Sequence, residues 1–154
     1  PLRSGVYRLL LELKKKDIDN YLVTTSGIKA TKALLQKSIL NYQQLFSGLI
    51  TYENVINHKP HPEAYLKALY LSNSTHINSL VIEDSEIGLQ AAKMAGLKCL
   101  ISISPWNDFK ANSFIEADSV ANSLGSIDEE TILYRGKSLI QKYVCSDYLV
   151  SLLN

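Results

Sequence analysis

The chain has 154 residues, of which 46% are hydrophobic and 20% are charged, the usage of a globular domain rather than of a disordered chain. Its net charge of +1 gives no electrostatic reason to expect binding to nucleic acid or to an acidic membrane surface. No apolar run approaches the length of a membrane span. Cys99 and Cys145 are too few for a disulfide framework, and Cys99 lies in an apolar run that favours a buried, reduced thiol.

The first half of the chain alternates helical and strand-like segments. Apolar residues recur at helical spacing between Val6 and Leu13, with Ser4 as the expected N-cap. The short apolar run 21–24 predicts a strand, and residues 28–39 predict the helix that follows it. A second short strand is expected at 49–51.

The same alternation continues in the second half. Pro62 suits the first turn of a helix, and the inner face of that helix is expected to hold Tyr65, Ala68 and Leu69. Further strands are expected at 79–82, 98–102 and 117–120. The helix between the first two of these strands is expected to bury Ile87, Ala91, Met94 and Ala95. Apolar strands separated by amphipathic helices predict an α/β fold with a doubly wound, mostly parallel, Rossmann-like sheet covered on both faces.

The pattern changes near the C-terminus. We assign residues 1–126 to the core and residues 127–154 to an appendage packed on the same domain. Within this tail the sequence predicts an edge strand at 131–134, a turn at 135–136 and a short helix at 146–153.

Polar residues follow two of the predicted strands, at the positions where open parallel sheets bind their ligands. Thr24, Thr25 and Ser26 offer hydroxyls and backbone N–H groups to an anion, although helix capping by Ser26 is an alternative. Lys59 lies on a loop that Pro60 holds extended. It could place a point charge on a phosphate, or it could simply be solvated.

An acidic pair, Glu83 and Asp84, follows the strand at 79–82. Adjacent carboxylates at the end of a buried strand are costly unless a positive group compensates them. Magnesium does so in proteins, where it takes one or two carboxylates together with water and phosphate oxygens. The alternative is a solvated loop in which Asp84 or Ser85 caps the next helix.

Two histidines, His58 and His61, flank Lys59. No cysteine or further histidine lies at ligand spacing, so we interpret both as residues of a surface loop.

The order of hydroxyl, lysine and acidic pair resembles the haloacid dehalogenase-like (HAD) superfamily. Thr24 matches the second motif of that family, Lys59 its third, and Glu83 with Asp84 its fourth. The stretch 81–96 is similar to the family signature over its whole length, and it looks most like the β-phosphoglucomutase/CbbY branch. The resemblance implies hydrolysis or transfer of phosphate through an aspartyl-phosphate intermediate, with Mg²⁺ as cofactor.

The resemblance also implies a role for each matched residue. Thr24 would bond a phosphoryl oxygen with help from the Thr25 backbone N–H, and Lys59 would pair with the phosphate and the nucleophile. Asp84, together with Glu83, would hold magnesium. Thr24, Lys59 and Asp84 are therefore the predicted catalytic residues within this chain.

The family's nucleophile motif, Asp-x-Asp-Gly-Thr after a first strand, is absent. Asp17 and Asp19 precede a strand instead of following one, so we interpret them as turn residues. In the family, the nucleophile strand is central and lies between the strands that carry Thr24 and Asp84. Its absence would leave two unpaired inner edges. Since a cap domain separates that strand from the segment resembling residues 1–5, we expect a fragment, inactive alone, of a longer protein with an N-terminal strand and cap.

The predicted function of the complete protein is a Mg²⁺-dependent phosphatase acting on a small phosphorylated sugar or metabolite, with a sugar bisphosphate such as xylulose 1,5-bisphosphate as a candidate. A β-phosphoglucomutase-like phosphomutase and an inactive phosphate- and magnesium-binding or regulatory module remain as alternatives. A phospho-receiver-like domain is disfavoured because its acidic pair should precede its lysine. We expect a cytoplasmic protein, or one of the plastid stroma if it is organellar. The tail 143–153 looks like that of CbbY-like members from photosynthetic cells.

Overall fold

The computed structural model describes residues 2–105 and 113–154; Pro1, the first residue of the segment 1–5 that resembles the family, lies outside them. The α-helices are α1 (Val6–Lys15), α2 (Ile28–Ser38), α3 (Glu63–Ser72), α4 (Glu86–Met94) and α5 (Ser146–Leu153). The strands are β1 (Tyr21–Val23), β2 (Gly48–Ile50), β3 (Leu80–Glu83), β4 (Lys98–Ser102), β5 (Ser119–Ala121) and β6 (Leu133–Arg135). Short 3-10 helices are formed by Tyr42–Gln44 and Tyr52–Asn54.

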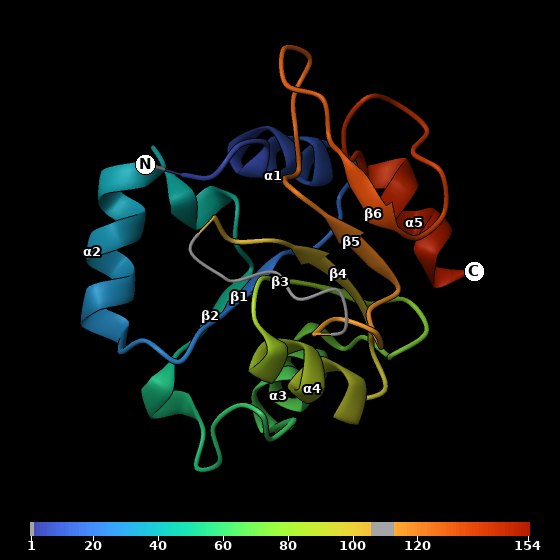
Figure 1. Cartoon of the computed structure of the whole chain (residues 1–154). Coiled ribbons are helices and arrows are strands. Elements are labelled where there is room, and N and C mark those ends of the chain that lie inside the picture. Colours follow the sequence, from blue (N-terminus) through green and yellow to red (C-terminus); the bar gives the residue numbers. More distant parts are fainter. Residues whose placement is uncertain (1, 106–112) are drawn as a thin grey trace.

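The strands form two separate sheets (Figure 1). β1 and β2 pair in parallel, while β3, β4 and β5 form a parallel set that the antiparallel strand β6 extends. Within the described ranges, β1 pairs only with β2 and β3 pairs only with β4. The two edges that face each other are therefore unpaired, as predicted for a chain that lacks the central strand.

Helices cover both faces of these strands, which confirms the doubly wound α/β fold. Along β4, Cys99 and Ile101 pack against residues of α3 and α4, whereas Leu100 packs against α1 and α5. All three side chains are fully buried, as expected for a central strand of a doubly covered sheet. Burial raises the pKa of the Cys99 thiol to about 12, so the thiol stays protonated, in agreement with its interpretation as a buried, reduced cysteine.

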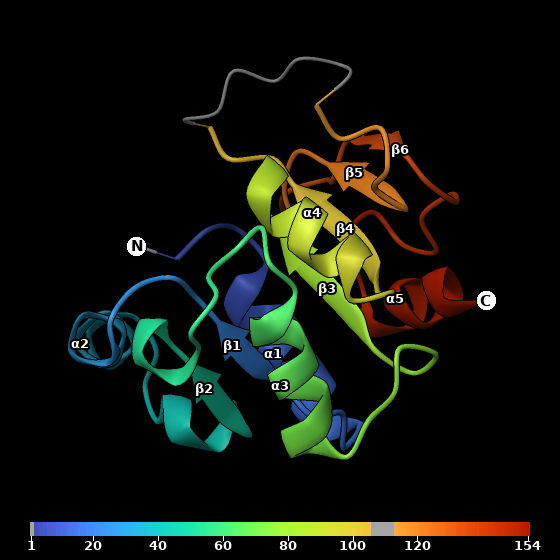
Figure 2. The same ribbon diagram turned by 90° about the horizontal axis from the view of Figure 1, so that it is seen from below.

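Two helices hold the separate sheets together. On one face, α1 places Leu9 in the cluster that covers β4 and Leu10 in the cluster that covers β1 and β2. On the other face, α3 contacts β1, β2 and α4 (Figure 2). Within the described residues, the two sheets do not pair with each other, and apolar packing on both faces therefore holds them together. No described helix is long and apolar enough to cross a membrane.

The C-terminal tail packs on the same core as α1. Arg8 donates hydrogen bonds to the carbonyls of Leu124 (3.1 Å) and Val144 (2.7 Å). Glu12 accepts a hydrogen bond from the backbone N–H of Ser146 (2.8 Å) at the start of α5. Its negative charge also interacts favourably with the positive end of the helix dipole there. These bonds join both ends of the tail to a single helix.

The edge strand of the tail begins two residues later and ends one residue later than predicted. Arg135 belongs to β6 and pairs with Val120 of β5, so its assignment to a turn is wrong. Gly136, with a φ of 117°, makes the turn instead. Pairing with β5 sets the position of this strand, and the local sequence pattern does not contain that information.

The predicted N-cap of α1 is also wrong. Gly5, not Ser4, is the N-cap, with a left-handed φ of 80° and no capping side chain. A Cβ atom on Gly5 would lie 2.4 Å from the carbonyl oxygen of Gly125. The close approach of the Leu124–Gly125 segment therefore selects glycine here.

The predicted inner face of α4 is partly wrong. Ala91 and Ala95 are buried as expected, but Ile87 and Met94 are 48% and 64% exposed. Leu89 and Ala92 take their place in the core. The buried side of α4 also carries Gly88, against which the Glu83 carboxylate lies.

The turn before β1 agrees with the sequence analysis. Asp17 has a left-handed φ of 53°, a conformation that aspartate tolerates in turns. Asp19 accepts a hydrogen bond from the Ser47 hydroxyl at 2.5 Å. Both residues precede β1, at the edge opposite the polar clusters, which confirms their interpretation as turn residues.

Candidate active site

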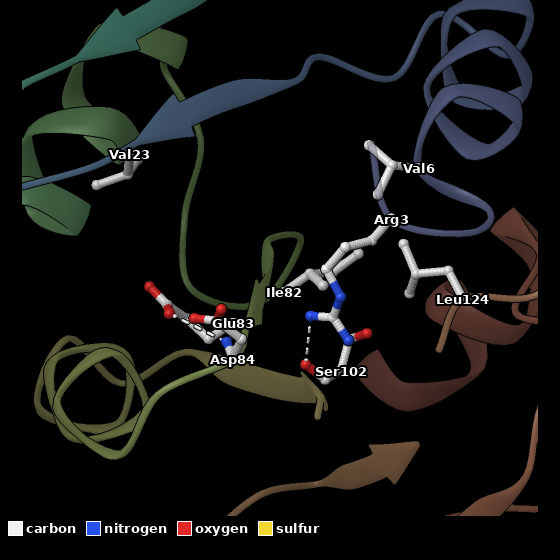
Figure 3. A pocket seen from close by; sticks show the side chains of 8 residues that line it. All are labelled: Arg3, Val6, Val23, Ile82, Glu83, Asp84, Ser102 and Leu124. Atoms are coloured by element: carbon white, nitrogen blue, oxygen red, sulfur yellow. Dashed lines mark hydrogen bonds between the residues drawn. The ribbon is translucent and has the colours of Figure 1, made fainter. Parts of the chain in front are cut away.

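A cavity of about 210 Å³ lies between β1 and β3 at the carboxyl ends of the strands (Figure 3). Its lining residues are Arg3, Val6, Val23, Ile82, Glu83, Asp84, Ser102 and Leu124. Ile82 is 36% exposed although it lies within a strand, whereas strands inside a parallel sheet are normally covered. The cavity therefore lies beside the two unpaired strand edges.

Lys59 connects the two sheets across this break. Its ammonium donates to the carbonyl oxygen of Val23 in β1 (3.1 Å) and to the carboxylate of Glu83 in β3. The side chains of Lys59 and Glu83 are only 7% and 9% exposed. A buried ion pair is tolerated when further hydrogen bonds satisfy both charges, and the Val23 carbonyl provides one of these.

The Glu83 carboxylate is held from several directions. Its Oε1 accepts hydrogen bonds from Lys59 and from the Tyr65 hydroxyl. Its Oε2 accepts from the Asp84 backbone N–H and the Ser85 hydroxyl, both at 3.3 Å. A Cβ atom on Gly88 would lie 2.2 Å from the carboxyl carbon. Glycine at position 88 is thus what makes room for this carboxylate.

Tyr65 is a polar contact that the sequence analysis missed. It was predicted only as part of the inner face of α3, and its side chain is indeed buried. Burial, together with the neighbouring charge of Glu83, raises the pKa of Tyr65 far above its ordinary value, so the hydroxyl remains a donor. A buried tyrosine needs a hydrogen-bond partner, but the sequence does not identify which one.

The predicted phosphate-binding residues lie at the same edge. Thr24 directly follows Val23, the residue whose carbonyl binds Lys59. The Thr24 hydroxyl accepts a hydrogen bond from the Ser26 backbone N–H (3.1 Å), while Thr25 is exposed. The fold therefore brings the Thr24 hydroxyl, Lys59 and the acidic pair to one end of the molecule.

The two capping alternatives have different outcomes. Ser26 does not cap α2, because the Glu53 carboxylate accepts from the Ile28 backbone N–H at 3.0 and 3.1 Å instead. The pKa of Glu53 is lowered by its own backbone N–H, by the Thr51 hydroxyl and by the Ile28 N–H, in decreasing order of effect. Ser85 does cap α4, since its hydroxyl accepts from the Gly88 backbone N–H at 3.2 Å.

The acidic pair suits magnesium by its chemistry. Asp84 is exposed and lines the cavity beside Glu83. The described residues contain no group of three or more histidine, cysteine, aspartate or glutamate side chains placed to hold a metal. Two carboxylates are nevertheless within the usual protein contribution to a magnesium site, where water and phosphate oxygens complete the coordination. The assignment of Glu83 and Asp84 as ligands stays a prediction.

The two histidines beside Lys59 have other contacts. The His58 ring stacks on Tyr52, with ring centroids 4.1 Å apart. His61 accepts a hydrogen bond from the Glu63 backbone N–H (3.2 Å) through Nδ1. Both contacts organise the loop that carries Lys59.

Arg3 lines the cavity, and the sequence analysis did not single it out. Its guanidinium donates to the carbonyls of Ser102 (2.8 Å), Ile103 and Asn122 (3.4 Å). These carbonyls lie where β4 and β5 end, so Arg3 places a positive charge against the carboxyl edge of the sheet (Figure 3).

Comparisons with known proteins show what the chain as a whole is similar to. The family model for haloacid dehalogenase-like hydrolases matches residues 1–102. A CBBY-like protein of Arabidopsis thaliana is 30% identical over 94% of this chain and 45% of its own length. A phosphorylated carbohydrates phosphatase of Thermotoga maritima is 33% identical over 76% of this chain and 53% of its own length. A crystal structure of a CbbY mutant from Rhodobacter sphaeroides superposes with a TM-score of 0.74 at 29% identity, covering 82% of this chain and 57% of that chain. The chain thus spans about half the length of the curated relatives it matches.

Proposed function

The chain belongs to the haloacid dehalogenase-like hydrolase family, in its CbbY and β-phosphoglucomutase-like branch, and we propose that it supplies the phosphate- and magnesium-binding part of a phosphatase active site. The observation that carries this proposal is the position of Lys59. Its ammonium lies at the carboxyl ends of β1 and β3, in contact with Glu83 of the acidic pair and with the strand that leads to Thr24. A cation, hydroxyls and carboxylates at one sheet edge are the groups that phosphoryl transfer requires.

Each residue has a proposed part in binding the phosphate. The Thr24 hydroxyl and the Thr25 backbone N–H donate to a phosphoryl oxygen, and the Lys59 ammonium neutralises a second oxygen. Asp84 and Glu83 provide carboxylate oxygens for magnesium. When bound, magnesium would lower the charge on the phosphoryl group that a nucleophile must approach.

In this proposal the nucleophile is an aspartate outside this chain, since the family's Asp-x-Asp-Gly-Thr motif does not occur in its sequence. The strand that carries it would pair with the inner edges of β1 and β3, which run parallel to their own partners and are unpaired on the facing side. Its carboxylate attacks phosphorus as the bond to the substrate oxygen breaks, and the leaving oxygen takes up a proton. Water then hydrolyses the aspartyl phosphate and releases phosphate.

The proposed substrate is a phosphorylated sugar. The Rhodobacter CbbY mutant was crystallised with xylulose-(1,5)bisphosphate, and the Thermotoga relative carries the name of a phosphorylated carbohydrates phosphatase. A second candidate is a module that binds phosphate and magnesium without turnover. The unpaired edges of β1 and β3, where a nucleophile strand would lie, favour keeping this candidate.

The test is Mg²⁺-dependent release of phosphate from sugar phosphates by the natural protein that carries this chain. Activity should disappear on addition of EDTA and fall at least a hundredfold in Asp84→Asn, because the exposed carboxylate at the cavity is lost. Asp147→Asn is the matched control, since Asp147 pairs with Lys16 on the surface (2.6 Å). Full activity of Asp84→Asn would refute its assigned role. Phosphate binding without turnover would favour the second candidate.

A further inference from the structure

The Glu83 carboxylate has two donors of different kinds on one oxygen. Lys59 comes from a loop and carries the charge proposed to bind phosphate, whereas the Tyr65 hydroxyl comes from α3 and is neutral. The Lys59 ammonium also lies 4.8 Å from the centre of the Tyr65 ring, within the range of a cation–π contact. Tyr65 therefore contacts both members of the buried ion pair.

These two donors differ in how freely they move. Lysine has a long, flexible side chain, so its ammonium is able to shift toward a phosphate. Tyr65 is 5% exposed and belongs to the core cluster that includes Val81 and Leu89. Its hydroxyl is therefore fixed relative to β3, regardless of where the lysine points.

The surroundings leave the carboxylate little freedom. Gly88 closes one side, where even a methyl group would collide with it. Oε1 lies against Tyr65, so Oε2 is directed toward the Asp84 backbone N–H. In this orientation Oε2 of Glu83 lies next to Asp84, which also lines the cavity.

We propose that Tyr65 is a positioning residue that holds the Glu83 carboxylate in place when Lys59 turns from it to a bound phosphate. Without this hydroxyl, a buried carboxylate would lose its remaining strong donor at the moment the lysine leaves, and its orientation toward magnesium would no longer be fixed. Such outer contacts of metal-ligating groups typically contribute 10- to 100-fold to metal affinity or activity. The inference rests on the proposed magnesium site and adds a residue to it.

The test is calorimetric titration of Mg²⁺ into the natural protein, in the presence of inorganic phosphate, for the wild type and Tyr65→Phe. We expect the Kd for Mg²⁺ to rise about tenfold or more in Tyr65→Phe. Tyr148→Phe is the matched control, because Tyr148 is fully buried and its hydroxyl bonds Ser119 Oγ at 2.9 Å. It should lower the melting temperature as much as Tyr65→Phe does and leave the Kd unchanged.

A second pair of variants separates the hydroxyl from the shape of the ring. 4-Aminophenylalanine at position 65 restores a donor and should bring the Kd back toward the wild-type value, whereas 4-methylphenylalanine fills the space without a donor and should not. Equal Kd values for the two, or a Tyr65→Phe value within twofold of wild type, would overturn the inference. Failure of the wild type to bind Mg²⁺ would instead overturn the proposed function.

Discussion

Replacing Lys59 by methionine should destabilise the protein far more than the loss of a surface lysine. The substitution keeps the length of the side chain but leaves Glu83, 9% exposed, without its counter-charge. Removing one partner of a buried ion pair typically costs 3–5 kcal/mol. Because Tyr65 still donates to Glu83, we expect the lower end, about 3 kcal/mol of unfolding free energy. Adding Glu83→Gln removes the stranded charge, so the double variant should recover about 1 to 2 kcal/mol of that loss.

Urea unfolding followed by circular dichroism measures these differences. Lys67→Met is the matched control, because Lys67 lies on α3 and its ammonium donates only to the exposed carbonyl of Asn54 (2.6 Å). Its cost should be about 1 kcal/mol or less. The reasoning is refuted if Lys59→Met costs no more than Lys67→Met, or if the effects of Lys59→Met and Glu83→Gln simply add.

Two further substitutions test other contacts. Partial burial raises the pKa of Asp118, but bonds from Lys93 (2.7 Å), the Cys99 backbone N–H (2.9 Å) and Lys98 (3.1 Å) outweigh this and lower the pKa overall. The stabilisation is therefore complete above the unfolded pKa of about 3.9 and is lost as the pH falls through the lower folded value. Asp118→Asn should cost about 1 to 2 kcal/mol at neutral pH in urea unfolding, with the difference vanishing in acid; a pH-independent difference would contradict this. Gly88→Ala should destabilise by about 1 to 3 kcal/mol, because the new methyl group meets the Glu83 carboxylate. An exposed helical Gly→Ala change normally stabilises instead, so a gain in melting temperature would show that Glu83 does not lie there.

The order of the elements was predictable because it depends on periodicity and on short-range signals. Patterns in consecutive residues predict the apolar runs of β3 and β4 and the turn at Asp17. The gathering of Thr24, Lys59 and Glu83 at one edge was also predictable, since parallel strands bring their carboxyl ends together. The unpaired inner edges followed from the family resemblance, and the strand pairing confirms them.

The contacts that the sequence did not reveal all join distant segments. Tyr65 meets Glu83 because α3 packs against β1, β2 and α4, and Arg3 reaches the Ser102 carbonyl at the end of β4. The wrong N-cap at Ser4 has the same origin, since the Gly125 carbonyl approaches Gly5 too closely for a side chain. Local propensity carries no information about such long-range packing.

Phosphate binding measured with and without Mg²⁺ tests most directly whether Lys59 and Asp84 belong to one site. Calorimetry on the natural protein should show that Mg²⁺ tightens phosphate binding, and by linkage that phosphate tightens Mg²⁺ binding by the same factor. Lys59→Met should lose phosphate affinity, and Asp84→Asn should lose the dependence on Mg²⁺, while Lys67→Met should behave as the wild type. Phosphate affinity that is independent of Mg²⁺ and unchanged in Lys59→Met would contradict the account.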